Sequence, residues 1–305
     1  MDRASILREL EPTVGQLMDR HLETTKEWFP HQHVPYGRGR DFAEDEAWCA
    51  EAADLGGSSI DDAVRSSLIV NLLTEDNLPY YFRTIERELG DDGPWGAWTK
   101  RWTAEEGRHS MVIYGYLMVT RAIDPIALER SRMCQVSQGI SPDPASPLHA
   151  FIYLTMQELA TRIAHRNTGN LLGDSIGYDV MMRVASDENR HHLFYRDLTS
   201  AAFELAPNEM MVAVADEAAR FEMPGVGIPD FTRHASAIAK AGIYDLPIHH
   251  EQVLMPMLQR WNVSALVGLD AAGEQARERL LAFAEKSGRV AQRLADRRAA
   301  APAPA

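Results

Sequence analysis

Two short motifs in this chain place a carboxylate and an imidazole one helical turn apart. Glu106 is followed three residues later by His109, and Glu188 is followed in the same way by His191. In an α-helix, residues i and i+3 lie on one face, so each pair can offer two metal-ligating side chains to a common neighbour. With 11 histidines in 305 residues, one such pair is close to chance expectation. Whether the pairs belong to a metal site must therefore be judged from the surrounding segments.

Each pair has another glutamate one helical hairpin upstream. Glu75 precedes Glu106 by 31 residues, and Glu158 precedes Glu188 by 30. Each interval has the length of one antiparallel helical hairpin, so the two glutamates of each unit should lie at similar depth in the bundle. The repeated unit predicts a pseudo-two-fold four-helix bundle in which two helices each supply a Glu and two supply a Glu-x-x-His motif. Four carboxylates and two imidazoles suit iron or manganese.

The glutamates lie on helix faces that are otherwise apolar. Trp95 and Ile113, for example, share the face of Glu106. A charged side chain on a buried face is costly unless it is paired or bound to a metal. For Glu75 or Glu158 alone, a buried glutamate satisfied by an arginine is the simpler interpretation. The repeated spacing favours a metal site.

Two further acids immediately precede ligand candidates in the sequence, Glu105 and Asp187. A ligating histidine usually donates its second ring N–H to a carboxylate or carbonyl. Across the pseudo-two-fold axis, Asp187 is expected to serve His109, and Glu105 is expected to serve His191. The alternative for both acids is a surface position beside a helix.

Three other polar side chains lie near the ligand candidates. Thr161 follows Glu158 by three residues, and its hydroxyl either faces the cluster or bonds its own backbone, as helical threonines usually do. His165 shares the face of Glu158, and we expect it to be a core or surface histidine. His192 points about 100° away from His191 and is expected not to bind metal.

The apolar periodicity and the positions of Pro and Gly predict an all-α chain. Helices are expected at 3–27, 58–89, 94–121, 147–168, 175–205, 208–222, 230–241, 246–261 and 270–297. Residues 122–146 are expected to be less regular, and Gly169 is expected to cap the fourth helix. The helices are assigned to a single domain, 1–297, followed by a disordered tail, 298–305.

Two residues should disturb the ligand helices. Pro79 lacks the N–H that would bond the Glu75 carbonyl, so the helix should be distorted beside that ligand. Gly107 lies between Glu106 and His109 and costs about 1 kcal/mol relative to alanine in a helix interior. The sequence offers no reason for this glycine.

Composition narrows the functional classes. The net charge of −13 argues against nucleic-acid binding. The two cysteines, Cys49 and Cys134, form no C-x-x-C motif, which argues against a disulfide framework, an iron–sulfur cluster or a zinc knuckle. No apolar run reaches the roughly 18 residues of a membrane span, and the N-terminus lacks a signal-peptide pattern. A cytoplasmic protein is expected.

Five stretches together are specific enough to indicate a family: 73–79, 102–109, 157–162, 165–168 and 187–191. Through them the chain resembles the soluble acyl-[acyl-carrier-protein] desaturases, the ferritin-like di-iron enzymes of plastids and actinobacteria. The similarity extends over residues 8–262 and includes 28–30 and 223–225. It implies a ferritin-like four-helix di-iron bundle with additional N- and C-terminal helices.

The resemblance also implies roles for individual residues. Thr161 falls where the family has a threonine linked to oxygen activation. Asp187 and Trp28 fall on an electron route through His109, although composition alone would make Trp28 an anchor for the end of the first helix. The implied ligands of two iron ions are Glu75, Glu106, His109, Glu158, Glu188 and His191.

The chain departs from the family pattern at three positions. Gly107 stands where Asn is usual, Ser110 stands where Gly is usual, and His192 is atypical. These departures leave the predicted ligand set intact. They call into question whether the residues around the ligands, the reaction rate and the position of the substrate are those usual in the family.

The implied reaction uses ferredoxin electrons and dioxygen to introduce a cis double bond into an acyl chain on acyl carrier protein, in fatty acid biosynthesis. The family also implies a homodimer. A dry apolar tunnel must hold the acyl chain, and the bulky candidates to line it are Met111, Met118, Met156 and Phe194. A core methionine is more often simple packing.

Carrier protein and ferredoxin are acidic, as this chain is, so docking requires a local basic patch. Candidate contributors are Arg38, Arg40, Arg83 and Arg87.

Two other functions compete with desaturation. One is a different di-iron oxidation on this scaffold, such as acyl hydroxylation or a reaction on a natural-product substrate. The other is a non-enzymatic ferritin-like iron-binding or storage protein, although storage chains are usually shorter and lack a long C-terminal extension.

Overall fold

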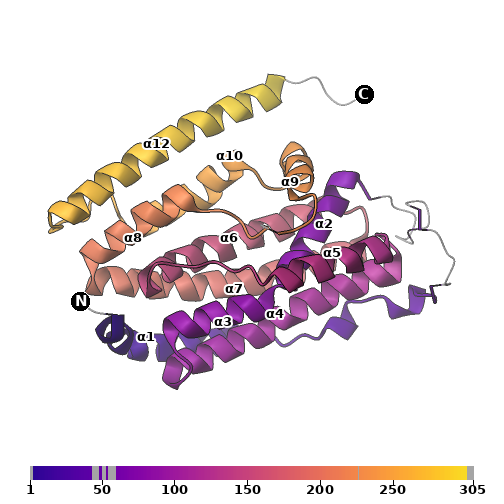
Figure 1. The fold of residues 1–305 in the computed structure, drawn as a ribbon, viewed down its shortest axis with the longest axis horizontal. Coiled ribbons are helices and arrows are strands. Elements are labelled where there is room, and N and C mark those ends of the chain that lie inside the picture. The colour runs from indigo at the N-terminus through magenta and orange to yellow at the C-terminus, as the bar shows by residue number, and fades with distance from the viewer. Residues whose placement is uncertain (1–2, 43–47, 50–52, 54–59, 226, 301–305) are drawn as a thin grey trace.

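The computed structural model describes residues 3–42, 48–49, 53, 60–225 and 227–300. Over these residues the chain is helical and has no β-strand, which confirms the all-α prediction. Four helices form the centre of the molecule (Figure 1). They are α2 (Asp62–Glu75), α4 (Gly93–Thr120), α6 (Pro147–Leu171) and α7 (Ser175–Leu205).

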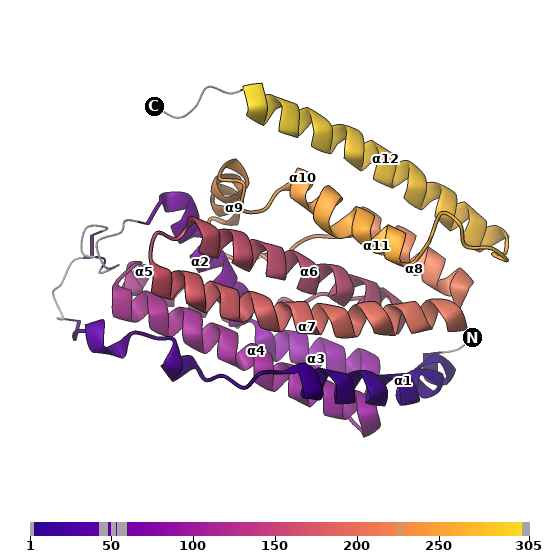
Figure 2. The same ribbon diagram turned by 180° about the vertical axis from the view of Figure 1, so that it is seen from behind.

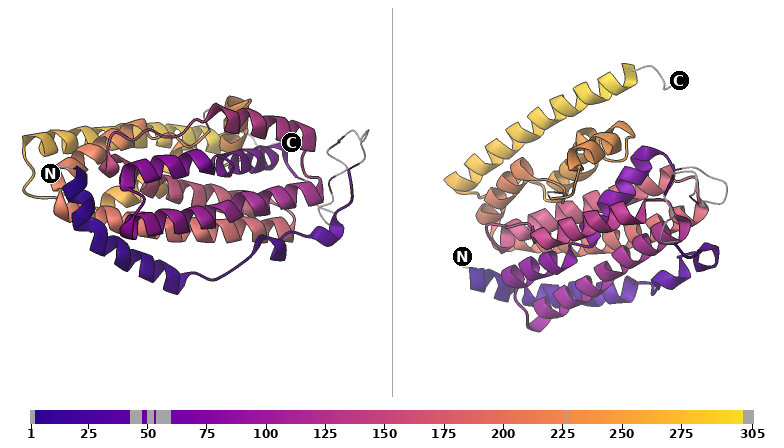
Figure 3. Two further views of the ribbon diagram at one scale, coloured as in Figure 1. Left: turned by 60° about the horizontal axis from the view of Figure 1, so that its bottom comes forward. Right: turned by 45° about the vertical axis from the view of Figure 1, so that its right-hand side comes forward.

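The remaining helices surround this centre. They are α1 (Arg3–Thr24), α3 (Leu78–Leu89), α5 (Pro125–Gln138), α8 (Pro207–Arg220), α9 (Phe231–Lys240), α10 (Leu246–His249), α11 (Met255–Arg260) and α12 (Ala271–Ala300). Helix α1 packs along α4 and α7, and α12 packs outside α8 and α10 (Figures 2 and 3). None of the described helices has a stretch long and apolar enough to cross a membrane.

The predicted second helix is two helices. Helix α2 ends at Glu75, and α3 begins at Leu78 with Pro79 in its first turn. Pro79 cannot donate to the Glu75 carbonyl, so the expected distortion is confirmed as a break directly beside this glutamate. The buried Asn77 holds the break in place because its Nδ2 donates to the Ile140 carbonyl at 2.6 Å. The predicted start of this helix, residue 58, lies outside the described residues.

Two local predictions were wrong. Residues 122–146 contain the regular helix α5, which Asp124 caps by accepting from the Ile126 and Ala127 N–H groups, with Pro125 at the first position. Gly169 does not cap α6, which continues to Leu171. A Cβ at Gly169 would lie 3.0 Å from the Met181 Cβ, so this glycine lets α6 approach α7 closely.

The C-terminal region also differs from expectation. Helix α12 continues to Ala300, so residues 298–300 are helical and were wrongly assigned to a disordered tail. Residues 301–305 lie outside the described residues. The predicted helix 246–261 contains a π-helical segment, His250–Leu254, between α10 and α11. Pro256 explains the irregularity, because it removes one backbone donor from the ladder.

Two hydrophobic cores flank a polar layer inside the bundle. On α4, Trp95, Trp98 and Trp102 belong to one core, and Ile113 and Leu117 belong to the other. Helix α7 divides in the same way, with Val184 and Leu198 on opposite sides of its motif. The two Glu-x-x-His motifs occupy the layer between the cores.

Candidate metal centre

The four central helices bring the six predicted ligands into two overlapping groups. One group contains Glu75, Glu106, His109 and Glu188, and the other contains Glu106, Glu158, Glu188 and His191. Within each group the candidate ligand atoms lie within 4.8 Å of one another, and all of these residues are buried. Glu106 and Glu188 belong to both groups, so the two groups share these carboxylates.

Several buried atoms of this cluster point at one another without pairing. Among the described residues, no hydrogen-bond partner is present for Nδ1 of His109, Nδ1 of His191, Oε1 of Glu106 or Oε2 of Glu158. His191 Nδ1 lies 2.7 Å from Glu106 Oε1, and His109 Nδ1 lies 3.3 Å from Glu106 Oε2. Buried polar atoms rarely lack partners, and a carboxylate and imidazole set of this kind is a typical binding site for a transition metal. The residues therefore fit a metal pair.

The electrostatics agree with a cation site. Burial, followed by the charge of Glu188, raises the pKa of Glu106 and raises that of Glu158 well above its ordinary value. Burial acts in the same direction on Glu75 and Glu188, but the adjacent imidazoles of His109 and His165 outweigh it and lower the pKa of both. Four carboxylates this close do not remain ionised together without added positive charge.

Outer carboxylates lie behind both histidines. His191 Nε2 lies 2.9 Å from Glu105 Oε2, and His109 Nε2 lies 3.5 Å from Asp187 Oδ2. In each ring, the Nε2 side faces the outer acid and the Nδ1 side faces the cluster. An acid hydrogen-bonded at Nε2, as Glu105 is to His191, holds the proton there and leaves the Nδ1 lone pair free for a metal.

The outer acids have partners of their own. Trp28 donates its indole N–H to Asp187 at 2.8 Å, and its ring lies under the Arg108 guanidinium at 4.8 Å. Arg108 and Arg190 also pair with Asp187. The structure thus joins Trp28, Asp187 and His109 in one buried chain.

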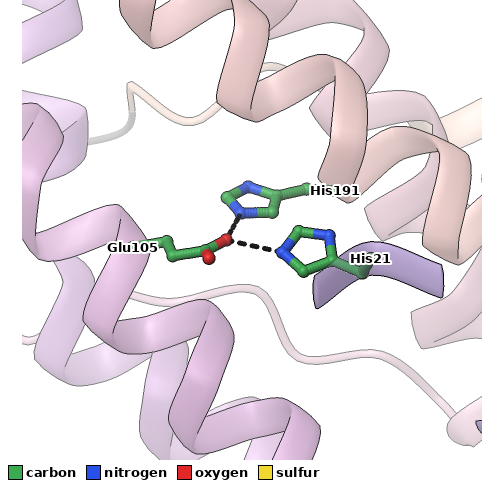
Figure 4. A group of neighbouring side chains, drawn as sticks. All are labelled: His21, Glu105 and His191. Carbon is green, nitrogen blue, oxygen red and sulfur yellow. Dashed lines mark hydrogen bonds and ion pairs between the residues drawn. The ribbon is translucent and has the colours of Figure 1, made fainter. Parts of the chain in front are cut away.

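Sequence reasoning missed His21. Its Nε2 lies 2.8 Å from Glu105 Oε2, the same oxygen that meets His191 (Figure 4). The signal was present, because His21 continues the buried face of Leu10, Val14 and Leu17 in α1.

Thr161 makes both of the contacts that were considered for it. Its hydroxyl lies 3.0 Å from the Gln157 carbonyl and 3.0 Å from Glu188 Oε2. The residue therefore bonds its own helix and still contacts the cluster.

His165 is a core histidine, as expected, but it also contacts the cluster. Its Nε2 lies 3.2 Å from Glu75 Oε1 and 3.6 Å from Glu188 Oε1. His192 is buried on another side of α7, where its Nδ1 lies 2.9 Å from the Thr155 carbonyl. Burial lowers the pKa of His192 to about 4, which keeps this ring neutral.

Two cavities reach the cluster. A narrow one of about 50 Å³ extends from Glu75 and Glu106 along α3, between apolar side chains that include Ile85 and Leu154, to Glu88. A wider one of about 390 Å³ also reaches Glu75 and lies beside α9 and α10. An apolar space that ends on polar ligands is suited to a long aliphatic substrate.

The tunnel residues expected from sequence were wrong. Neither cavity is lined by any of the predicted residues, Met111, Met118, Met156 and Phe194. Met111 is 65% exposed because it lies two residues past His109, on another face of α4. Met156 and Phe194 are buried in a core, and Met118 packs against the other core.

With the geometry in place, comparison with known proteins decides the family. A family model described as fatty acid desaturase matches residues 2–305. The chain belongs to the fatty acid desaturase family. This result confirms the resemblance inferred from the motifs.

Relatives of this desaturase family member occur in bacteria and plants. DesA1 of Mycobacterium tuberculosis, which is named as an acyl-[acyl-carrier-protein] desaturase, is 40% identical over 90% of this chain and 83% of its own length. The chloroplastic palmitoyl-[acyl-carrier-protein] 4-desaturase 2 of Ophrys sphegodes is 34% identical over 79% of this chain and 68% of its own. The chloroplastic stearoyl-[acyl-carrier-protein] 9-desaturase of Gossypium hirsutum is 29% identical over 95% of this chain and 77% of its own.

A solved structure of the family has the same fold. The X-ray structure of DesA2 from Mycobacterium tuberculosis H37Rv aligns with a TM-score of 0.71 and 26% sequence identity. The alignment covers 89% of this chain and 99% of that chain. The predicted ferritin-like helical architecture is thereby confirmed.

The unusual glycine of this desaturase sits in open space. A Cβ at Gly107 would meet only the Leu78 Cδ2, at 4.0 Å, among atoms outside its own helix in the described structure. Sterics therefore do not require glycine there, and nothing in the structure explains its presence.

Proposed function

We propose that this chain is an acyl-[acyl-carrier-protein] desaturase that introduces a cis double bond into a carrier-bound acyl chain. The observation that carries the proposal is the junction of an apolar cavity with the buried cluster at Glu75 and Glu106. The names of the bacterial and plant relatives support the same activity. The reaction removes one hydrogen from each of two neighbouring methylenes, and these two hydrogens, together with two electrons from the donor and two protons, reduce one dioxygen to two waters.

The metal of this centre is proposed to be a pair of iron ions. Glu75 and His109 would hold one ion, and Glu158 and His191 would hold the other. Glu106 and Glu188 would lie between them, because each belongs to both groups. When bound, such a pair supplies the oxygen chemistry that an unactivated C–H bond requires.

The protein's own residues position the acyl chain and exclude water from the cavity that holds it. The side chains of Leu78, Ile85 and Leu154 exclude water from the narrow cavity and keep methylenes beside Glu75 and Glu106. Thr161 is proposed to serve the oxygen chemistry through its hydroxyl, which contacts Glu188.

Electrons are proposed to come from ferredoxin and to enter through Trp28, Asp187 and His109. The supporting observation is the continuous buried chain of contacts from the indole through the carboxylate to the imidazole. Glu105 and His191 form the corresponding contact on the other side of the centre.

Docking of the acidic carrier protein and ferredoxin is proposed to use exposed arginines, although the net charge of the chain is −13. Arg38, Arg40, Arg83 and Arg87 all lie at exposed positions. Arg87 is partly neutralised because it pairs with Glu88 and Asp143. Arg83 forms no ion pair within the described part of the chain, so it is the stronger candidate of these two.

A homodimer is proposed from an exposed apolar surface on α4 and α5. The residues that line this surface include Phe42, Tyr114, Ile126 and Met133, and Met133 is 64% exposed. Apolar patches of this kind often mark protein–protein contacts. Light scattering of the purified protein measures the assembly directly.

The activity test is incubation with acyl carrier substrates, ferredoxin, its reductase and dioxygen, followed by mass spectrometry of the acyl group. Loss of two hydrogens with cis geometry supports desaturation. A hydroxylated product would instead assign a different oxidation to the same centre. Loading of iron far beyond a pair per chain, without acyl turnover, would identify a storage protein.

A further inference from the structure

His21 is a buried histidine outside the predicted ligand set, and it reaches the centre from a separate helix. It lies in the last turn of α1, is 4% exposed, and meets Glu105 Oε2 at 2.8 Å. Figure 4 shows the His21 and His191 rings converging on this one oxygen from opposite helices. The other Glu105 oxygen accepts from Arg101 Nε at 2.6 Å.

These contacts hold Glu105 from three helices. Helix α1 supplies His21, α4 supplies Arg101, and α7 supplies His191. A carboxylate with donors on both oxygens has little freedom to rotate, so it presents a fixed acceptor to His191 Nε2. That acceptor keeps the ring proton on Nε2 and directs Nδ1 toward Glu106 and Glu158.

Ring packing adds to the constraint. The His21 and His191 rings stack with centroids 5.8 Å apart, and the His21 and Trp98 rings pack in a T-shaped arrangement with centroids 5.1 Å apart. His21 therefore limits both the rotation of Glu105 and the tilt of the His191 ring.

The three residues also have the composition of a small metal site, but hydrogen bonding accounts for them better. Both nitrogen-to-oxygen distances, 2.8 and 2.9 Å, are those of ordinary hydrogen bonds. The Arg101 guanidinium already balances the Glu105 charge, so a further cation would face a positive neighbour.

We propose that His21 is a positioning residue of the metal centre. Through Glu105 it fixes the His191 ring. Docking of α1 thereby sets the affinity for the metal ion that Glu158 and His191 would hold, called here the His191 half of the centre. This inference rests on the metal centre of the proposed function. It assigns a role in that centre to a helix that contributes no ligand.

The test is anaerobic titration of metal-free protein with Fe(II) against a competing chromophoric chelator. His21→Leu removes the donor and keeps an apolar side chain of similar volume in the packed site. We expect one of the two iron equivalents to weaken by roughly 10–100-fold, as outer-partner substitutions typically do. The Mössbauer spectrum of the ⁵⁷Fe-loaded variant should show the change at one iron and not at the other.

Two variants separate positioning from general loosening of α1. His21→Gln places an amide N–H near the former Nε2 and should restore most of the affinity. Arg20→Ala removes a contact of α1 with α7, the 2.7 Å bond from Arg20 to Asp197, and should leave both affinities at wild-type values. Thermal melts followed by circular dichroism establish that each variant is folded.

A double variant tests the path through Glu105. If His21 acts through this carboxylate, then His21→Leu combined with Glu105→Gln should lose no more affinity than Glu105→Gln alone. Wild-type affinity in His21→Leu, equal losses in His21→Leu and Arg20→Ala, or additive losses in the double variant would overturn the inference. Failure of the wild-type protein to bind iron would instead reject the metal centre itself.

Discussion

His109 and His191 belong to the proposed metal centre through the same motif, yet the residues on their outer sides differ. Behind His109, Asp187 lies 3.5 Å away and accepts from the indole of Trp28. Behind His191, Glu105 lies 2.9 Å away and contacts the imidazole of His21. The repeated sequence makes the ligands alike, and the N-terminal segment makes their surroundings different.

We propose that this difference gives the two halves separate tasks. The His109 half ends in an indole, a side chain suited to electron entry. The His191 half ends in a hydrogen-bonded imidazole that holds a carboxylate in place. Both terminal residues come from the first 28 residues of the chain, so docking of this segment affects both halves.

The largest expected effect is loss of metal when a ligand is removed. His191→Ala should lose most of the bound iron, and Glu106→Ala should lose both ions because Glu106 belongs to both groups. Elemental analysis of purified protein gives the iron content per chain. Unchanged content in both variants would reject the ligand assignment.

The next largest effect is expected when one of the two outer acids, Asp187 or Glu105, is removed. Asp187→Ala and Glu105→Ala should each weaken iron binding by roughly 10–100-fold, because each leaves a ligating ring without its acceptor. Chelator competition measures both affinities. If the halves are separate, each variant should perturb one iron in the Mössbauer spectrum, and perturbation of both irons by either variant would contradict this.

A smaller effect is expected from Trp28→Phe. The variant loses the bond to Asp187 and part of the contact with Arg108, which should lower the free energy of unfolding by about 1–2 kcal/mol. Iron content should remain that of the wild type, while reduction by ferredoxin in stopped-flow experiments should slow. His21→Leu is the matched comparison, since it should weaken iron binding and leave the rate of reduction at the His109 half unchanged.

The smallest effect is a gain in stability from Gly107→Ala. A Cβ fits at this position, so the variant should raise the free energy of unfolding by about 1 kcal/mol through better helix propensity. Chemical denaturation measures this change. A loss of stability would show that this glycine has a conformational role after all.

Spacing along single helices predicted much of the centre. The intervals from Glu75 to Glu106 and from Glu158 to Glu188 each match one hairpin, and both Glu-x-x-His motifs occupy one face of a helix. These features are local, because helical periodicity and hairpin length follow from the chain itself. The break at Pro79 could be predicted for the same reason, since it follows from one missing N–H.

Distant partners that lie outside the repeated unit could not be predicted in this way. His21 and Glu105 are 84 residues apart, and His165 and Glu75 are 90 apart. The positions of the cavities were also missed, because Met111 and Phe194 lie near the ligands in sequence but face solvent or the core. The sequence by itself determined the all-α class, the ligand types and their repeat. Only the tertiary structure decided that His21 meets Glu105, because that contact depends on how α1 docks against α4 and α7.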